Sequence, residues 1–288
     1  MKILLLWLLC LMVAGCAGAE DAPTDVPLVL TALNVGKADC LLLQSGADAY
    51  LIDTGTKAAA DTVTRALRVL GVERLTGVIL THTDSDHAGG AKPLAKTDLP
   101  VGAWYASTYY TDIKSEKKHP AVKAASERGL EVVWLEGGMA LPLDGGTLTV
   151  LGPCTRSDKE NCNSVVLLAE GGGGKMLLTG DMEFPEEAEL LAAGLIPRCD
   201  VLKVGNHGES DASSEAFLYT VRPRVAIIST STAEEPDTPA KRVLKALMAV
   251  GAQIEQTQNA ALGIRVALSG GEVTVERLGW DDVSPALQ

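Results

Sequence analysis

The chain has 288 residues, of which 47% are hydrophobic and 22% charged, and its formal net charge is −12 at pH 7. This is the composition of a globular protein with a sizeable core. The acidic balance excludes a long-range attraction for nucleic acid or anionic lipid, so a phosphate-bearing substrate would need a locally positive path.

The first residues have the pattern of an exported protein. Lys2 precedes an apolar run over residues 3–13, and small residues follow. This arrangement is typical of a secretory signal peptide and is too short for a comfortable membrane span. Four residues at the end of the run, VAGC, resemble a bacterial lipobox. The resemblance implies lipid on the sulfur of Cys16 and an anchor in a bacterial membrane, facing outside the cytoplasm.

The lipobox also sets the predicted boundaries. It implies a lipoprotein signal peptide over residues 1–15; the alternative is a plain secretory signal cut near Ala17 or Ala19. Residues 16–27 are small, acidic and proline-containing, which predicts a flexible tether. The folded domain is then expected over residues 28–288.

Strand and helix patterns alternate along this domain. Alternating or continuous apolar runs predict strands, and apolar spacing of three or four residues predicts helices. Strands are predicted at residues 29–35, 39–44, 49–53, 77–81, 101–105, 131–135, 139–151, 164–169, 175–179, 199–204, 224–229, 253–257, 262–268 and 272–277. Helices are predicted at 58–70, 88–96, 120–128, 185–193, 213–221 and 238–250. The order fits one α/β unit with two mixed sheets and helices outside them.

Four cysteines follow the signal region. An exported chain with an even number of them permits disulfides. Cys154 and Cys162 bracket a polar loop, and they either close it as a disulfide or remain free thiols. Cys40 and Cys199 lie in or beside predicted strands, which favours buried free thiols.

A cluster of ligand-type side chains follows the strand at 77–81. The stretch THTDSDHAGG, residues 81–90, contains His82, Asp84, Asp86 and His87. Imidazole and carboxylate are the ligands of zinc and similar ions. An aspartate capping a helix start is the structural alternative. Because two of the four histidines of the chain fall in this one turn, we favour the metal site.

This stretch resembles the metal-binding motif of the metallo-β-lactamase superfamily, in the variant found in the C-terminal domain of the DNA-uptake protein ComEC. Further segments resemble that family in the same order: LNVGKADCLLL (33–43), LIDTG (51–55), NCNSVVLL (161–168), LLTGDME (177–183) and DVLKVGNHG (200–208). The resemblance implies an αββα sandwich of two mixed sheets flanked by helices. It covers nearly the whole predicted domain.

The resemblance also implies a site for two divalent metal ions, with zinc expected and manganese as the competitor. His82 and Asp84 would hold the first ion, and Asp86, His87 and His207 the second. Asp181 would bridge the two ions.

The mechanism implied is attack by a hydroxide formed from water on a divalent ion. In that mechanism Asp86 would also orient the water. Lys203 either meets a substrate oxyanion or is an ordinary exposed strand lysine. Asp39 and Asp53 either orient ligands from behind or cap turns.

The chain departs from the wider superfamily near the predicted site. No histidine stands near residues 160–164, where Glu160, Asn161 and Asn163 occur instead. The ComEC-type branch shares these asparagines. Asn206 replaces a histidine of that branch before His207, and its later Gly-His-Pro reads Asp-Thr-Pro at 237–239. The residues expected on the substrate side therefore depart further from the ComEC-type pattern than the expected metal ligands do.

One basic segment lies near aromatic residues. Residues 112–123 contain four lysines and His119, and Tyr109 and Tyr110 precede them. Such a patch suits single-stranded nucleic acid, but a solvated helix start explains it equally simply and is favoured. We do not expect His119 to bind metal.

Three functions are compatible with these features. The first is an exported, lipid-anchored, metal-dependent phosphodiesterase or nuclease-like enzyme of ComEC type. The second is a hydrolase of carboxylic esters, lactones or amides, and the third is a non-catalytic binding lipoprotein on a degenerate hydrolase fold. Apart from the signal region, no run of about 20 apolar residues occurs, so any DNA-uptake permease would be a separate protein.

Overall fold

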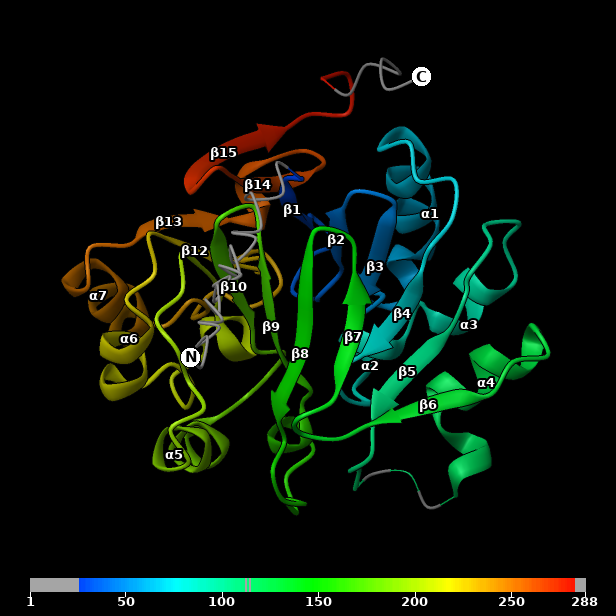
Figure 1. Ribbon diagram of the computed structural model, residues 1–288, viewed down its shortest axis with the longest axis horizontal. Helices are drawn as coiled ribbons and strands as arrows, with labels where there is room; N and C mark the ends of the chain where they lie inside the picture. Colours follow the sequence, from blue (N-terminus) through cyan, green and yellow to red (C-terminus); the bar gives the residue numbers. More distant parts are fainter. Residues whose placement is uncertain (1–25, 112, 114, 283–288) are drawn as a thin grey trace, which may run out of the picture.

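The structure is a computed structural model that describes residues 26–111, 113 and 115–282. The predicted signal peptide, Cys16 and most of the predicted tether lie outside these residues. Two β-sheets pack face to face, and helices cover both outer faces, as Figure 1 shows. The predicted αββα fold is therefore confirmed.

The first sheet contains eight strands in the order β15-β14-β1-β2-β3-β4-β5-β6. In that order the strands are β15 (Glu272–Leu278), β14 (Gly263–Ser269), β1 (Leu28–Leu33), β2 (Leu41–Ser45), β3 (Asp48–Ile52), β4 (Gly77–Leu80), β5 (Trp104–Ser107) and β6 (Val132–Leu135). Strands β3 to β6 are mutually parallel, so their carboxyl ends lie at one end of the sheet.

The second sheet contains seven strands in the order β13-β12-β11-β10-β9-β8-β7. They are β13 (Gln253–Gln256), β12 (Val225–Ile228), β11 (Val201–Lys203), β10 (Gly174–Leu178), β9 (Val166–Gly171), β8 (Gly146–Gly152) and β7 (Ala140–Leu143). Strands β10 to β13 are parallel, and β9 runs antiparallel to β10. The start of β9 therefore lies beside the end of β10.

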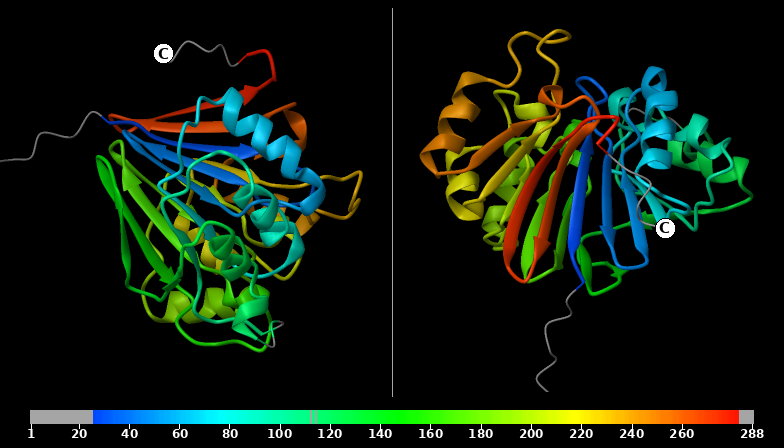
Figure 2. Two further views of the ribbon diagram at one scale, coloured as in Figure 1. Left: turned by 90° about the vertical axis from the view of Figure 1, so that its right-hand side faces the viewer. Right: turned by 90° about the horizontal axis from the view of Figure 1, so that it is seen from above.

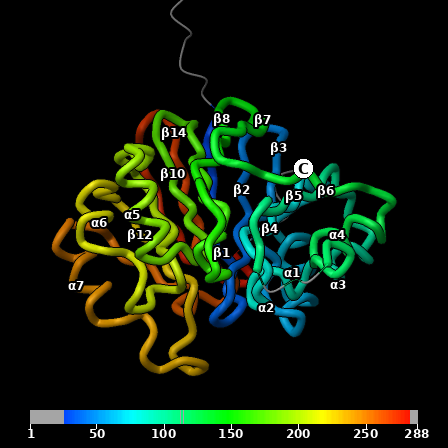
Figure 3. The backbone as a smooth tube through the Cα atoms, turned by 90° about the horizontal axis from the view of Figure 1, so that it is seen from below, coloured from blue at the N-terminus to red at the C-terminus, as the bar shows by residue number. Residues whose placement is uncertain are grey.

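Seven α-helices lie outside the sheets in the described part of the chain. They are α1 (Ala60–Val69), α2 (Ser85–Ala88), α3 (Ala91–Ala95), α4 (Pro120–Glu127), α5 (Phe184–Ala192), α6 (Glu215–Val221) and α7 (Lys241–Ala249). In Figures 2 and 3, α1 to α4 lie on one side of the strands and α5 to α7 on the other. None of these helices is long and apolar enough to cross a membrane.

Alternation along the strands places apolar side chains between the sheets. Leu28, Leu30 and Ala32 of β1 share a buried cluster with Leu167 of β9 and Met176 of β10. Side chains on the outer faces pack under the helices in two further clusters. This layering follows directly from the two-residue period of strands and the apolar stripes of the helices.

The helix predicted at 88–96 is divided and begins earlier. It is replaced by α2 and α3, which are separated by Gly89 and Gly90. A Cβ atom on Gly89 would lie 2.3 Å from the carbonyl oxygen of Ser85, and one on Gly90 would lie 2.3 Å from that of Thr54. The two glycines are therefore required for the close packing of this turn against the segment after β3.

The cysteines are free thiols in the structure. The disulfide alternative for Cys154 and Cys162 is therefore wrong. The Cys162 thiol faces a carboxylate oxygen of Glu183 at 3.9 Å, and the Cys154 thiol faces the carbonyl oxygen of Leu151 at 3.9 Å. Cys40 and Cys199 are buried free thiols, as predicted.

Candidate metal centre

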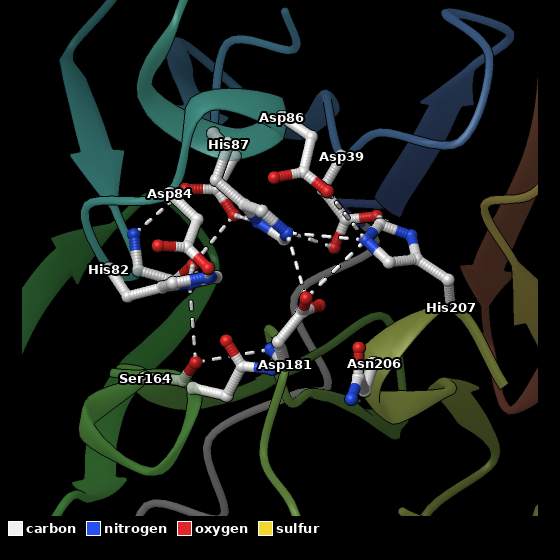
Figure 4. A network of polar contacts seen from close by, with 12 residues as sticks. Asp39, His82, Asp84, Asp86, His87, Ser164, Asp181, Asn206 and His207 are labelled. Carbon is white, nitrogen blue, oxygen red and sulfur yellow. Dashed lines mark hydrogen bonds and ion pairs between the residues drawn. The ribbon is translucent and has the colours of Figure 1, made fainter. Parts of the chain in front are cut away.

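The ligand-type residues gather where parallel strands of both sheets end. His82 follows β4, Asp181 follows β10 and His207 follows β11. Because carboxyl ends of parallel strands lie at the same edge, the two packed sheets bring these residues together. Figure 4 shows the side chains pointing toward one another from opposite halves of the sandwich.

Four of the predicted ligands form one compact group. One ligand atom from each of Asp86, His87, Asp181 and His207 lies within 4.8 Å of the others. An Asp181 oxygen, Oδ2, is 3.1 Å from Nε2 of His87 and 3.4 Å from Nε2 of His207. Asp86 Oδ2 lies 3.4 Å from the same His207 nitrogen. The set predicted for the second ion, with Asp181, therefore converges on one point.

The hydrogen bonds behind the two imidazoles fix which nitrogen faces this point. His207 Nδ1 lies 2.8 Å from the carbonyl oxygen of Ser229, which only accepts hydrogen bonds, so Nδ1 carries the proton. His87 Nδ1 lies 2.8 Å from Oδ2 of Asp53 and is assigned its proton for the same reason. When both rings are neutral, each Nε2 atom is unprotonated and presents a lone pair. The two Nε2 atoms are only 3.3 Å apart. Because two lone pairs at this distance repel each other, the arrangement favours a positive charge at this point, either a proton or a metal ion.

His82 presents a third bare nitrogen. The Thr81 hydroxyl donates to Oδ2 of Asp53 at 2.7 Å and therefore accepts from Nδ1 of His82 at 3.1 Å. His82 Nε2 is buried and has no hydrogen-bond partner, and Asp84 Oδ2 lies 3.7 Å from it. The ring centroids of His82 and His87 are 4.1 Å apart, so the two predicted ion positions are adjacent.

Asp181 stands between these positions. Its Oδ2 faces the His87 and His207 rings, while Oδ1 is buried without a hydrogen-bond partner. Its backbone N–H donates to Oγ of Ser164 at 3.1 Å, and the same hydroxyl lies 3.3 Å from Nδ1 of His82. Ser164 therefore links the backbone of Asp181 to the His82 ring.

The electrostatic environment favours positive charge. Burial alone would lower the pKa of His207, but the surrounding carboxylates, Asp181 foremost with Asp86 and Asp39, together outweigh it and raise that pKa to about 9. His87 behaves alike: Asp181 and Asp53 raise its pKa well above the usual value against the effect of burial. Burial would raise the pKa of Asp86, but the contact with His207 lowers it to about 2. Divalent metal ions would replace the ring protons among these carboxylates, because imidazole nitrogen and carboxylate oxygen are their usual ligands.

The structure places Lys203 away from solvent. It is fully buried, and its Nζ lies 2.7 Å from Oδ2 of Asp39, which is also fully buried. The ammonium also donates to the carbonyl oxygen of Val204 at 2.9 Å. The expectation of an exposed strand lysine is wrong, and with no exposed surface the side chain is not placed to meet a substrate oxyanion.

Asp39 and Asp53 lie directly behind the imidazoles. Asp39 Oδ1 is 3.8 Å from Nδ1 of His207, and Asp39 Oδ2 is 4.0 Å from Nδ1 of His87. Asp53 accepts from the N–H and the hydroxyl of Thr81 as well as facing His87. Asp53 therefore positions His87 through a hydrogen bond, whereas Asp39 forms an ion pair with Lys203 and adds negative charge behind the two rings.

The predicted asparagines do not join the ligand cluster. Asn161 donates to Oε1 of Glu183 at 3.0 Å, and Asn163 holds the loop before it through the carbonyl oxygens of Ser157 and Lys159. Asn206 donates to Oδ1 of Asp211 at 3.2 Å.

Asn206 and His207 are both left-handed, with φ of 45° and 52°. Asparagine adopts that conformation more readily than most residues. This turn brings the His207 ring into the cluster.

Glu160 occupies the region where the wider superfamily has its third histidine, but it is not available as a ligand. Its Oε1 accepts from the N–H and hydroxyl of Thr83 at 3.1 and 2.5 Å. Its Oε2 accepts from the N–H and hydroxyl of Thr111 at 2.6 and 2.8 Å. Glu160 therefore ties the metal loop to the segment after β5.

His119 lies outside the ligand cluster. Its ring is buried beside Tyr110 and Trp134, and its Nδ1 accepts from the N–H of Ala121 at the start of α4. Lys117 and Lys118 beside it are exposed. The described part of the basic segment is thus a solvated helix start.

Sequence reasoning missed three groups that orient the ligands: the Thr81 hydroxyl, the Ser164 hydroxyl and the Ser229 carbonyl. The first two stand inside quoted motifs, THTDSDH and NCNS, next to predicted site residues. A backbone carbonyl has no sequence signal, so the Ser229 contact is visible only in the fold.

Comparison with known proteins finds relatives among competence proteins. The chain is 31% identical over 201 residues to ComE operon protein 3 of Bacillus subtilis, covering 69% of this chain and 26% of that one. It is 28% identical over 275 residues to competence protein ComA of Neisseria gonorrhoeae, covering 94% and 37%. The chain therefore spans well under half of either relative.

Among solved structures, the metallo-beta-lactamase fold protein YhfI of Bacillus subtilis superposes with a TM-score of 0.51 at 14% identity. The match covers 84% of this chain and 99% of that one, which supports the fold alone. The sequence profile of the metallo-beta-lactamase superfamily matches residues 33–232. With its fold and its converging ligands, the chain belongs to the metallo-beta-lactamase superfamily and has the hydrolase fold of that superfamily.

Proposed function

We propose that the protein is a metal-dependent phosphodiesterase. The observation that carries the proposal is the convergence of the Nε2 atoms of His87 and His207 on the Asp181 carboxylate. Beside them lies the buried, unpartnered Nε2 of His82, whose ring centroid is 4.1 Å from that of His87. The similarity to two competence proteins favours a phosphodiester, the bond of the DNA backbone, among the bonds that such a site hydrolyses.

The proposal assigns His82 and Asp84 to a first divalent ion and Asp86, His87 and His207 to a second, with Asp181 between them. When bound, such ions supply Lewis acidity and make water a stronger acid near neutral pH. The first set offers one nitrogen and the second two, so zinc is expected in the second and manganese competes better for the first.

The chain itself supplies orientation and proton acceptance. Asp84 and Asp86 are the ligand carboxylates with solvent-exposed surface, 41% and 28% of their side chains. A substrate therefore approaches from their side. With its pKa lowered to about 2, Asp86 stays ionised and accepts a hydrogen bond from the attacking water instead of keeping its proton.

One observation favours the second candidate, hydrolysis of a carboxylic ester, lactone or amide. The two lysines that adjoin the described site are both paired: Lys203 with Asp39, and Lys37 with Glu209 at 2.8 Å and Glu235 at 3.0 Å. Neither is left to attract an anionic phosphodiester. An uncharged ester needs no such cation.

We also propose an exported, lipid-anchored location, with residues 1–15 as signal peptide and Cys16 as lipid carrier. The support is the lipobox-like sequence.

The test uses residues 17–288 and hydrolysis of bis(p-nitrophenyl) phosphate with zinc and with manganese. The variants are His87→Ala and, as matched control, His119→Ala, because His119 lies outside the ligand cluster. Metal-dependent turnover that is lost in His87→Ala and kept in His119→Ala would support the proposal. No turnover with either metal, together with turnover of p-nitrophenyl acetate, would refute it in favour of the ester hydrolase.

A further inference from the structure

A cavity of about 470 Å³ is lined by residues that follow β5, β6 and α5 and by residues of β8. We call it the edge cavity; its walls include Tyr109, Gly138, Thr149, Leu151, Pro153 and Leu195. These residues come from the turns after β5 and β6, the last residues of β8 and the segment after α5.

Strand directions place the edge cavity at the same end of the sandwich as the metal centre. β6 is parallel to β4 and β5, so the turn that contains Gly138 follows its carboxyl end. β8 is antiparallel to β9, so its last residues lie beside the start of β9, near Ser164. β4 and β6 are separated by one strand, so the carboxyl ends of these two strands lie roughly 10 Å apart.

Glu160 joins the two sites physically. Its carboxylate binds Thr83, which stands between the ligands His82 and Asp84, and it binds Thr111, two residues after Tyr109. The wall of the cavity is thus fixed to the metal loop by four hydrogen bonds to one carboxylate.

The residues that line the edge cavity indicate which kind of ligand it can hold. Leu151, Pro153 and Leu195 offer apolar surface and Tyr109 an aromatic ring, while Glu136 is the single charged residue of the lining. A carboxylate without a cation disfavours an anion. At Gly138 the direction of a Cβ is open, with no atom within 4 Å. Apolar walls with few polar groups are typical of sites for small organic ligands.

We propose that the edge cavity is a substrate subsite that holds a flat, uncharged aromatic ring attached to the scissile ester. The ester itself lies at the metal centre, and the ring reaches along the edge of the sandwich past Tyr109. The inference rests on the proposed function, because it assigns the organic part of that substrate.

The test fills the cavity. Cys154 lines it and is the one cysteine of the described chain that is not buried. We expect Cys154→Trp to raise KM for bis(p-nitrophenyl) phosphate by at least about tenfold with kcat and metal content retained, because the metal ligands are untouched. Leu195→Trp, at a half-exposed position of the wall, should act alike. Tyr219→Trp, on exposed α6, is the control and should leave KM unchanged.

A binding measurement separates this inference from the proposed function. Uncharged 4-nitroanisole, followed by NMR line broadening, should bind the wild type and bind Cys154→Trp at least about tenfold more weakly. If the diester is not hydrolysed but this difference is found, the phosphodiesterase proposal fails and the subsite stands. If neither tryptophan variant changes KM or ring binding, the subsite is refuted whatever the enzyme hydrolyses.

Discussion

The buried ion pair behind the metal centre makes a strong prediction about stability. Lys203 and Asp39 have no exposed side-chain surface and lie 2.7 Å apart. Replacing Lys203 by methionine, which has a similar length, leaves the Asp39 carboxylate buried without its cation. Removing one partner of a buried pair costs about 3–5 kcal/mol. The free energy of unfolding of Lys203→Met should therefore fall by about that amount.

Urea unfolding of the metal-free protein measures this loss. Lys175→Met is the matched control, because Lys175 pairs with Glu170 at the surface, where the side chains are 43% and 38% exposed. An exposed pair contributes at most about 1 kcal/mol. The double variant Lys203→Met with Asp39→Asn removes both charges and should recover much of the loss. Equal losses for Lys203→Met and Lys175→Met would refute the buried-pair argument.

Three further predictions concern histidines. His207→Ala should lower the metal content measured by mass spectrometry by about one ion per chain, whereas His119→Ala should leave it unchanged; equal contents would contradict the ligand assignment. Asp53→Asn should weaken zinc binding about 10- to 100-fold in chelator competition, because an amide no longer fixes the His87 proton on Nδ1; unchanged affinity would contradict this. Burial lowers the pKa of His119 to about 4, below its unfolded value of about 6.5, so its contribution to stability is lost as pH falls from about 6.5 through 4. Relative to His119→Asn, the wild type should lose about 2 kcal/mol between pH 7.5 and 5, and parallel pH curves would count against it.

The fold could be predicted from the sequence because the two-residue period of the strands and the 3.6-residue period of the helices are both clear in the chain. The run GVIL followed by THTDSDH marks a buried strand that ends in a polar turn, and β4 ends at Leu80 as that pattern requires. The helix boundaries were harder to predict, since Gly89 and Gly90 act through contacts with a segment more than 30 residues away. A local pattern contains no such contact.

The ligand types were readable from the sequence, but their surroundings were not. Lys203 stands at the end of a strand, where an exposed lysine would be ordinary, yet it shares the inner face of β11 with Val201, between the two sheets, and Asp39 reaches it from the other half of the chain. Glu160 had no predicted partner, and its four hydrogen bonds come from threonines about 50 and 77 residues away. Pairings across such separations depend on topology, which a single sequence specifies only indirectly.

The charges at the centre fit the two divalent ions of the proposed function. With neutral imidazoles and Asp39 offset by Lys203, four carboxylates remain without a cationic partner: Asp53, Asp84, Asp86 and Asp181. Their four negative charges equal the positive charge of two divalent ions. One ion would leave two charges uncompensated among largely buried groups, which is costly. Lys203 therefore contributes to the site without contacting substrate. Its charge compensates Asp39, which would otherwise be a fifth negative charge beside the two ions.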